Sequence, residues 1–438
     1  MRWSILAFTV TGAFVLPACA QIAGVGDRAR LSDDAGADAA GADAAGADAA
    51  SDASSEPNDE PVVEVCNFKS ENYEGLTDHG FDWTLGTWQS GPAVTNAGDV
   101  KAVALAGGRV AVAVLDQDAA RAQVFVVDST GALVAGPTDI TACAPFSGFG
   151  IAAAGFDAGE IGVAVGSSDP QCSPNCVSLT RYDAGSLSVL ETRALDPSAA
   201  GQTYKVQDIY DLGWSTAGYV ALVLDGDGEP RIIMADHMGD KFGSPQWTGV
   251  FSVGGPDVGA LAIGPEIGWA MSGSLGGMPQ AAIGITSMGA YYQTLPPQSP
   301  DVPSRNPRIA RDGKAVAWLG RDLVYTRSYN AYAVQEGELS RIDATGKVVA
   351  TTIAGSGLGT AAHSVVVVDG SPVVTYFEPG GIGIARFSPD VTRVDTPSGD
   401  IHIADTNLHS IVAYSGGVTL VRVSPDGSHI EAAPLQCP

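Results

Sequence analysis

The chain has 438 residues, of which 45% are apolar and 16% are charged, so it can bury a large core. Its formal net charge is −26. No Lys/Arg cluster offers the positive surface that replaces phosphate counterions, which argues against nucleic acid as a partner. The chain holds 55 glycines and 26 prolines without a collagen period, and no long segment has apolar residues at helical spacing. Many short strands joined by tight turns are expected, and the predicted class is all-β.

Residues 1–18 are predicted to be a signal peptide of the lipoprotein type. One positive charge at Arg2 precedes an apolar segment, residues 4–16, that is too short to span a bilayer. The following Leu16-Pro17-Ala18-Cys19 resembles a bacterial lipobox, in which the thiol of Cys19 receives the lipid. Pro17 departs from the small or aliphatic residue usual in that motif. Cleavage after Ala20, at an A-x-A site, is the alternative.

Residues 19–65 are predicted to be a disordered linker rich in Ala, Gly and Asp. The pentapeptide Gly-Ala-Asp-Ala-Ala occurs three times in residues 36–50, and its spaced glycines and like-charged aspartates oppose helix formation and packing. Such a flexible chain spans roughly 30–35 Å, which suits a tether between a lipid and a folded head. The arrangement resembles that of many bacterial surface lipoproteins. It implies export to the cell envelope and anchoring at the outer membrane or cell surface through the N-terminal lipid only; a secreted or periplasmic soluble protein is the alternative.

Five cysteines are available for pairing after either cleavage, because a lipidated Cys19 cannot form a disulfide, and an exported protein is expected to pair them where geometry allows. Cys172 and Cys176 flank a short turn, which predicts a local disulfide. Cys66 begins the folded part and Cys437 ends it, so a second bond is predicted if the two ends meet. Cys143 is then left over, as a buried thiol or as a competitor for Cys172 or Cys176.

A short hairpin recurs along residues 99–438, and its clearest copy is residues 340–349, where a turn closed by Gly joins two alternating strands. Seven copies of its turn are found, at Asp128, Asp183, Asp236, Thr286, Asp343, Ser388 and Ser424. An apolar hairpin precedes each turn, in residues 103–114, 151–165, 209–223, 261–271, 309–319, 365–376 and 401–414. Two hairpins make a four-stranded unit. Its first two strands are apolar on both faces, as expected of strands packed between neighbouring sheets.

Four-stranded units at this period resemble the blades of a β-propeller, in the broad class of WD-repeat and kelch-like proteins. The resemblance implies an all-β, seven-bladed β-propeller with four antiparallel strands per blade. The predicted domain is residues 66–438, with a leading segment at 66–98 and seven blades in 99–438. The sequence lacks a recurring Trp-Asp dipeptide and a kelch double glycine, so the resemblance supports a fold and carries no function.

The alternating segment of residues 81–88 is expected to add to the outer edge of the last blade, which would close the ring and protect that edge. Packing at this edge is the favoured interpretation of Trp83 and Trp88, over a role as aromatic ligands. An arginine precedes the turn residue by two positions in four copies, and we interpret these residues as partners of carboxylates between blades. They are Arg181, Arg341, Arg386 and Arg422.

No catalytic or metal-binding signature is found, and no cofactor is predicted. Residues 225–231 resemble the calcium loop of integrin-type propeller repeats, but the closing position holds the cation Arg231, which favours a simple turn. His363 and His402 are the candidates for the central channel, because each is predicted near the start of an innermost strand in adjacent blades. A structural role for both is the alternative.

The predicted function is a monomeric binding module for a protein or a glycan. A carbohydrate-active hydrolase or lyase, with acids from several blades at the mouth of the channel, is the second hypothesis. A structural component of the envelope is the third.

Overall fold

The structure is a computed structural model, and the chain divides into two units, Met1–Glu60 and Pro61–Pro438. All described residues belong to the second unit. They are residues 82–437 without 118–120, 141–145, 155–158, 168–176, 196–205, 216–217, 227, 229, 236–245, 248–257, 264–266, 276–277, 287–292, 295–303, 313, 323–334, 343–347, 357–361, 369, 395–398, 407 and 415. For part of residues 235–363 only the backbone is described. The predicted signal peptide, the linker and Cys19 lie outside these residues, as do Cys66, Cys143, Cys172 and Cys176.

The described strands form seven antiparallel sheets, numbered here in chain order. Sheets 1 to 3 contain β3 (Ala97–Ala104), β4 (Val110–Asp116), β5 (Arg121–Val127) and β6 (Leu133–Asp139); β7 (Phe146–Ala154), β8 (Glu160–Ser167), β9 (Val177–Asp183) and β10 (Val189–Ala194); and β11 (Val206–Ser215), β12 (Gly218–Asp225), β13 (Pro230–Ala235) and β14 (Gln246–Trp247). Sheets 4 and 5 contain β15 (Val258–Ile263), β16 (Ile267–Leu275), β17 (Met278–Thr286) and β18 (Gln293–Thr294); and β19 (Ser304–Asp312), β20 (Lys314–Asp322), β21 (Gln335–Ile342) and β22 (Val348–Ser356). Sheets 6 and 7 contain β23 (Ala362–Val368), β24 (Ser371–Glu378), β25 (Gly381–Arg386) and β26 (Ile401–Ala404); and β27 (His409–Tyr414), β28 (Gly417–Val423), β29 (His429–Gln436), β1 (Thr84–Leu85) and β2 (Gln89–Ala93).

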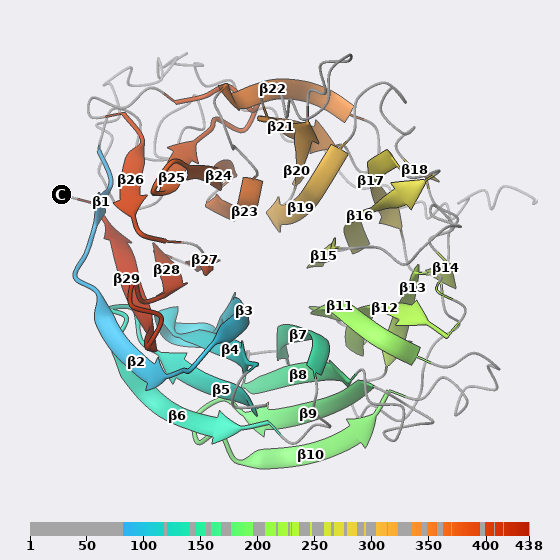
Figure 1. Ribbon diagram of the computed structural model, residues 1–438, viewed down its shortest axis with the longest axis vertical. Helices are drawn as coiled ribbons and strands as arrows, with labels where there is room; N and C mark the ends of the chain where they lie inside the picture. Colours follow the sequence, from blue (N-terminus) through green and yellow to red (C-terminus); the bar gives the residue numbers. More distant parts are fainter. Residues whose placement is uncertain are drawn as a thin grey trace, which may run out of the picture. The chain divides into compact units, whose positions relative to one another are not determined.

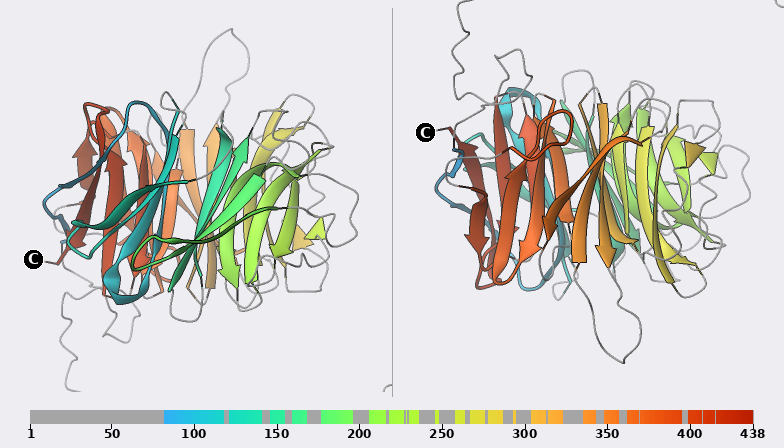
Figure 2. Two further views of the ribbon diagram at one scale, coloured as in Figure 1. Left: turned by 90° about the horizontal axis from the view of Figure 1, so that it is seen from below. Right: turned by 90° about the horizontal axis from the view of Figure 1, so that it is seen from above.

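The sheets of this unit stand side by side in a ring around a central opening (Figure 1). The first strand of each sheet is innermost, and the innermost strands β3, β7, β11, β15, β19, β23 and β27 contact their neighbours in that order around the opening. Side views show the strands running between the two faces of the ring (Figure 2). One short 3-10 helix, Ala106–Gly108, is the helical element in the described part of the chain. The all-β prediction, with four antiparallel strands as the repeating unit, is confirmed.

The core is divided into layers, each between two neighbouring sheets. Strand β4 shows why its sequence is apolar at every position. Val110, Val112 and Val114 pack toward sheet 7, whereas Ala111 and Leu115 pack toward sheet 2. Side chains alternate across a strand, so a strand that is buried on both faces cannot carry a polar side. Because one layer joins sheet 1 to sheet 7, the ring is closed.

The closing strands come from the start of the domain. β1 and β2 pair with β29, the third strand of sheet 7, which confirms the prediction that the leading segment completes the last blade. The seventh predicted repeat is partly wrong. Ser424 lies in the turn between the second and third strands of sheet 7, and residues 401–414 divide between β26 of sheet 6 and β27 of sheet 7. The strands of this repeat were misassigned because sheet 7 takes its outermost strands, β1 and β2, from the N-terminal part of the domain.

The recurring turn is structural. In the first copy the Asp128 carboxylate accepts hydrogen bonds from the backbone N–H and the hydroxyl of Thr130, at 2.8 and 2.6 Å, and from the N–H of Ala132. These bonds, the Thr130 hydroxyl first, lower the pKa of Asp128 below its usual value. Asp183 makes the equivalent contacts in sheet 2, with the N–H groups of Gly185 and Ser186. Function is therefore to be sought away from these turns.

The recurring arginine has more than one kind of partner. Arg341 fits the predicted role, because it donates to the Pro389 carbonyl and the Asp390 carboxylate of sheet 6. Arg181 instead pairs with Glu160 and Glu191 of its own sheet. In sheets 6 and 7 the guanidinium carbons of Arg386 and Arg422 lie 4.6 and 3.9 Å from the ring centroids of Trp83 and Trp88 in the closing segment. Arg422 also pairs with Glu431 of its own sheet at 2.8 Å and donates to the carbonyl of Ala404 in sheet 6. Both tryptophans thus pack at the edge, as favoured from the sequence.

Candidate functional site

Five innermost strands, β3, β7, β11, β19 and β23, have a bulge near their first residues, whereas β15 and β27 pair with their neighbours without one. The register slips between Ala97 and Asp99 in β3, between Phe146 and Phe149 in β7, and twice in β11, before Asp208 and before Asp211. β23 has the same slip between Ala362 and Ser364. A bulge leaves one residue unpaired and turns side chains toward a new direction. We call this end of the channel, where the innermost strands begin, the strand-start mouth.

An aspartate follows three of these bulges and caps the backbone there. Asp99, Asp208 and Asp211 each accept a hydrogen bond from the N–H of the next residue, at 2.8, 2.7 and 2.9 Å. The bulge disrupts the ladder at this point, and an N–H buried without a partner would cost about 1–3 kcal/mol. The aspartates thus have a structural task, and their position also brings carboxylates to the strand-start mouth.

Lys101 links three innermost strands across the channel wall. From β3, its ammonium donates to the carbonyl oxygens of Phe149 in β7 and Tyr210 in β11, at 2.6 and 2.5 Å, and lies 3.9 Å from a carboxylate oxygen of Asp211. The other oxygen of Asp211 accepts the N–H of Leu261 in β15 at 2.8 Å. Innermost strands of neighbouring sheets do not pair with one another, so this network provides polar links that the sheets themselves lack.

Asp208 occupies a niche between sheets 2 and 3. Its carboxylate accepts the hydroxyl of Ser147 at 2.7 Å as well as the N–H of Ile209. The niche depends on glycine, because a Cβ on Gly166 would lie 2.6 Å from the Asp208 carboxylate and a Cβ on Gly148 would lie 2.3 Å from the Ile209 carbonyl. Burial raises the pKa of Asp208 above its usual value, although these hydrogen bonds and the nearby Lys101 lower it.

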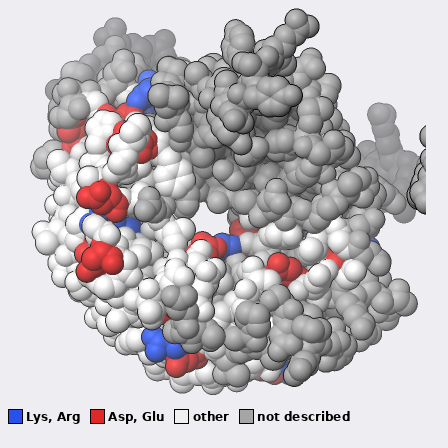
Figure 3. Space-filling model, in the orientation of Figure 1, with Lys and Arg blue, Asp and Glu red and all other residues white. Residues whose placement is uncertain are grey.

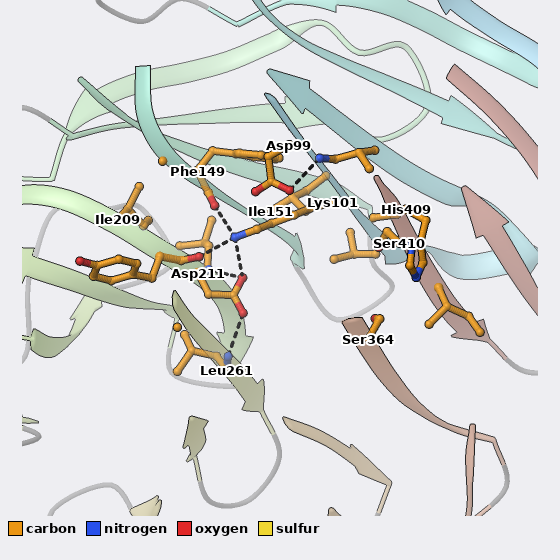
Figure 4. A pocket seen from close by; sticks show the side chains of 18 of the residues that line it. Asp99, Lys101, Phe149, Ile151, Ile209, Asp211, Leu261, Ser364, His409 and Ser410 are labelled. Atoms are coloured by element: carbon orange, nitrogen blue, oxygen red, sulfur yellow. Dashed lines mark hydrogen bonds and ion pairs between the residues drawn. The ribbon is translucent and has the colours of Figure 1, made fainter. Parts of the chain in front are cut away.

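The channel encloses a cavity of about 540 Å³, within the range of about 300–1,000 Å³ that small-ligand pockets occupy. Charged side chains line the rim of the central opening (Figure 3). One wall, from β3, β7 and β11, carries Asp99, Lys101, Asp208 and Asp211. The opposite wall, from β23 and β27, carries hydroxyl and aliphatic side chains, among them Ser364 and Ser410 (Figure 4). We call the first the acidic wall and the second the hydroxyl wall.

The two predicted channel histidines are not brought together. His363 lies at the bulge of the innermost strand β23, as expected from the sequence, and only its backbone is described. His402 contradicts the prediction. It lies in β26, the outermost strand of sheet 6, where its side chain is 62% exposed and its ring contacts the Glu378 carboxylate at 2.8 Å. The residue that begins the next innermost strand is His409, which is buried and contacts the Thr375 hydroxyl at 2.8 Å.

The remaining predicted sites have simple outcomes. Asp225 is buried and pairs with Arg231. The residue at the closing position of the calcium-like loop thus neutralises the carboxylate that would have to bind the ion, which is consistent with a simple turn. Cys437 is disulfide-bonded, while its predicted partner Cys66 lies outside the described residues and the pairing stays a prediction. Among the residues with described placement, no cluster of three His, Cys, Asp or Glu side chains could hold a metal ion. That same part of the chain contains no helix of the length and apolarity needed to cross a membrane.

The residues of the acidic wall were missed from the sequence. A usable signal was present, because Asp99-Val100, Asp208-Ile209 and Asp211-Leu212 each place an aspartate before an aliphatic residue at the start of an innermost strand. The glycines at 148 and 166 gave no signal, since glycine is frequent throughout this chain.

No family model and no curated protein matches the sequence. Solved structures resemble the chain at low identity. The WD40 repeats of RRP9 match with a TM-score of 0.50 and 9% identity, over 81% of this chain and 100% of that one. The WD40 domain of Toxoplasma gondii coronin matches with a TM-score of 0.48 and 10% identity, over 82% and 89% of the two chains. The β-propeller domain of the Trilobed protease from Pyrococcus furiosus matches with a TM-score of 0.44 and 11% identity, over 79% and 94%. Likeness at such identity shows the fold alone, and the described unit has the β-propeller fold.

Proposed function

We propose that this protein is a binding module whose protein or glycan ligand is held at the strand-start mouth of a seven-bladed β-propeller. The observation that carries the proposal is the arrangement of the acidic wall. Asp99 and Asp208 come from different sheets to one mouth of a 540 Å³ cavity, and each uses one carboxylate oxygen for the bonds described above. Their second oxygens have no hydrogen-bond partner among the described residues and are available to a ligand.

The polar groups of the acidic wall favour binding over catalysis. Lys101 is occupied by two carbonyls and a carboxylate, and Ser147 donates to Asp208 without a histidine among its described partners. A nucleophile needs a base within hydrogen-bond reach, and the base in turn needs an orienting group. The described lining does not form such a chain of groups.

A second candidate function is carbohydrate hydrolysis, and one observation favours it. Asp208 has a pKa raised by burial, and Asp99 shares the same mouth. Glycoside hydrolysis commonly uses a pair of carboxyl groups that flank the scissile bond. The two functions separate in one experiment with the purified full chain, in which glycan and peptide arrays measure binding and a parallel release assay measures product.

Retention on an array without release of product supports the binding module. The Asp99→Asn/Asp208→Asn double variant is expected to lose binding, while Asp139→Asn, on the outermost strand β6 with a side chain 66% exposed, serves as the matched control. Release of sugar that disappears in the double variant would establish the hydrolase instead. Binding that survives in the double variant would refute the strand-start mouth as the site.

The anchoring of the domain belongs to the same proposal. The Leu16-Pro17-Ala18-Cys19 motif and the linker that follows support attachment to the cell envelope through a lipid on Cys19. Cys19→Ala is expected to release the protein from membranes, and a variant that stays bound would contradict the lipid anchor.

Non-reducing mass spectrometry is expected to find a Cys66–Cys437 peptide pair, and an unpaired Cys66 would contradict the disulfide.

A further inference from the structure

We propose that the outer edge of β10 is a dimerisation surface, which pairs with β10 of a second copy of this chain. β10 is the outermost strand of sheet 2 and lies on the rim of the ring (Figure 1). Among the described strands it pairs with β9 alone. Its second edge therefore presents backbone groups that another extended strand can bind. The inference concerns the rim and is independent of the ligand at the strand-start mouth.

The pairing with β9 shows which residues of β10 direct their backbone groups outward. At the end of the strand the N–H of Leu195 donates to the Val177 carbonyl at 2.9 Å, so the backbone of Leu195 is directed toward β9. Residues of an antiparallel strand direct their N–H and C=O groups to its two neighbours in alternation. In the register of this pair Arg193 is therefore directed toward β9 as well, whereas Thr192 and Ala194 direct their backbone groups to the outer edge.

One self-pairing of this edge places opposite charges against each other. Two antiparallel copies of β10 can pair about a two-fold axis when outward-directed residues lie opposite one another. If Thr192 lies opposite Thr192 of the second copy, Glu191 of each copy lies opposite Arg193 of the other. These are non-hydrogen-bonded positions, where the side chains are closest. Moving the axis by one residue in either direction would oppose Glu191 to Glu191 or Arg193 to Arg193, and like charges directly opposite are destabilising.

The side chains at this edge are exposed enough to meet a second copy. Arg193 and Glu191 are 40% and 24% exposed. Val189 and Leu190, at the bulge that precedes the charged residues, are 50% and 49% exposed. They are two of the five exposed large apolar side chains among the described residues. In the two-fold pair Leu190 would lie beside Ala194 of the second copy, so apolar burial would add to the charge pairing.

The other outermost strands suit self-pairing less well. β6 contains Pro137 and β2 contains Pro92, and proline has no N–H to donate. β14 and β18 have two residues each, and β26 has four. β22 is longer, at nine residues, but none of them is charged, so no charge pair fixes a register between two copies.

The experiment measures self-association of the full chain by sedimentation at about 0.15 M salt, where charges more than about 8 Å apart are largely screened. Screening is needed because each copy has a formal charge of −26. The ladder is short, so we expect the monomer predicted from the sequence to be in equilibrium with a dimer in the micromolar range. Arg193→Glu should weaken the dimer at least about tenfold, because a carboxylate would then face Glu191 at two symmetry-related positions. Arg121→Glu, in β5 with a side chain 41% exposed, makes the same change of charge and should leave the dimer intact.

Two further variants separate loss of pairing from loss of fold. Glu191→Lys should also weaken the homodimer, whereas an equimolar mixture of Glu191→Lys and Arg193→Glu restores opposite charges at both positions. We expect this mixture to form a heterodimer with nearly wild-type affinity. Thr192→Pro removes an N–H that is directed away from β9, so it should keep the fold, measured by circular dichroism, and lose the dimer.

A monomer at all concentrations up to about 1 mM would overturn the inference. A dimer that persists at wild-type strength in Arg193→Glu and Thr192→Pro would also overturn it, as would folded Glu191→Lys and Arg193→Glu variants that stay monomeric when mixed. Equal weakening by Arg121→Glu would attribute the effect to net charge and overturn β10 as the surface. Loss of the dimer in Val349→Lys alone, at a residue of β22 that is 44% exposed, would place the interface on β22 instead. The proposed ligand site is tested separately, by the arrays.

Discussion

Replacing Lys101 with methionine tests whether the acidic wall is held together by one ammonium. The substitution keeps the unbranched stem and removes the two hydrogen bonds to the carbonyls of Phe149 and Tyr210 and the ion pair with Asp211, which join β3 to β7 and β11. A hydrogen bond to a charged group contributes about 1.5–3 kcal/mol net, and breaking a fully buried ion pair costs about 3–5 kcal/mol. The side chains of Lys101 and Asp211 are 26% and 20% exposed, so solvent screens part of the attraction between their charges. The expected loss is about 3 kcal/mol in the free energy of unfolding.

The assay is urea unfolding of the full chain, followed by tryptophan fluorescence. Arg121→Met is the matched control, because Arg121 and Asp139 form a pair at 3.5 Å whose side chains are 41% and 66% exposed. An exposed pair contributes about 0–1 kcal/mol. A Lys101→Met loss no larger than that of Arg121→Met would refute the claim that Lys101 cross-links the innermost strands.

Three further predictions follow from single contacts. Trp88→Ala should lower the free energy of unfolding by about 2–3 kcal/mol, since the ring lies 3.9 Å from the Arg422 guanidinium on the closing edge. Trp88→Phe should retain most of the wild-type stability, because a ring remains beside Arg422. A loss of equal size in both variants would contradict the ring contact. Gly162→Ala should lower the free energy of unfolding by about 2–4 kcal/mol in urea, because its Cβ would lie 2.2 Å from the Tyr219 ring. Gly159→Ala, with open space around it, is the control. Equal losses of stability in the two variants would show that the Tyr219 ring moves aside to accept the added methyl group. Burial raises the pKa of Asp208 above 3.8, so protonation favours the folded state and wild type should gain stability relative to Asp208→Asn as pH falls from 7 toward 4; thermal melts that show the opposite trend would contradict the desolvated carboxyl.

The sequence predicted the repeating sheet well because each strand is governed by local pattern. An apolar strand such as β4 can be stable only between two other sheets, so its composition indicated its place. The last sheet was mispredicted because its outermost strands, β1 and β2, come from the other end of the domain. The pattern of residues 401–414 looked like one hairpin, and nothing local indicates that the chain passes from one sheet to the next between Ala404 and His409.

The acidic wall was harder to predict for a physical reason. Asp208, Ser147 and Gly166 meet between two sheets although they are far apart in sequence, and Lys101 bonds to carbonyls that carry no side-chain signature. His402 was placed wrongly by the same error that shifted the last hairpin. Aspartates before aliphatic residues were visible, but only their position after a bulge shows that they cap the backbone and face the channel mouth.

Hydrogen exchange of the full chain, with and without the tightest-binding peptide from the array, tests the location of the site most directly. The account predicts slower exchange on binding in residues 97–101, 146–149 and 206–212, where the innermost strands begin. Residues 133–139 and 189–194, in the outermost strands β6 and β10, should be unchanged. Protection confined to the outermost strands, with the strand-start mouth unaffected, would contradict the central claim that ligand is held at this mouth of the channel.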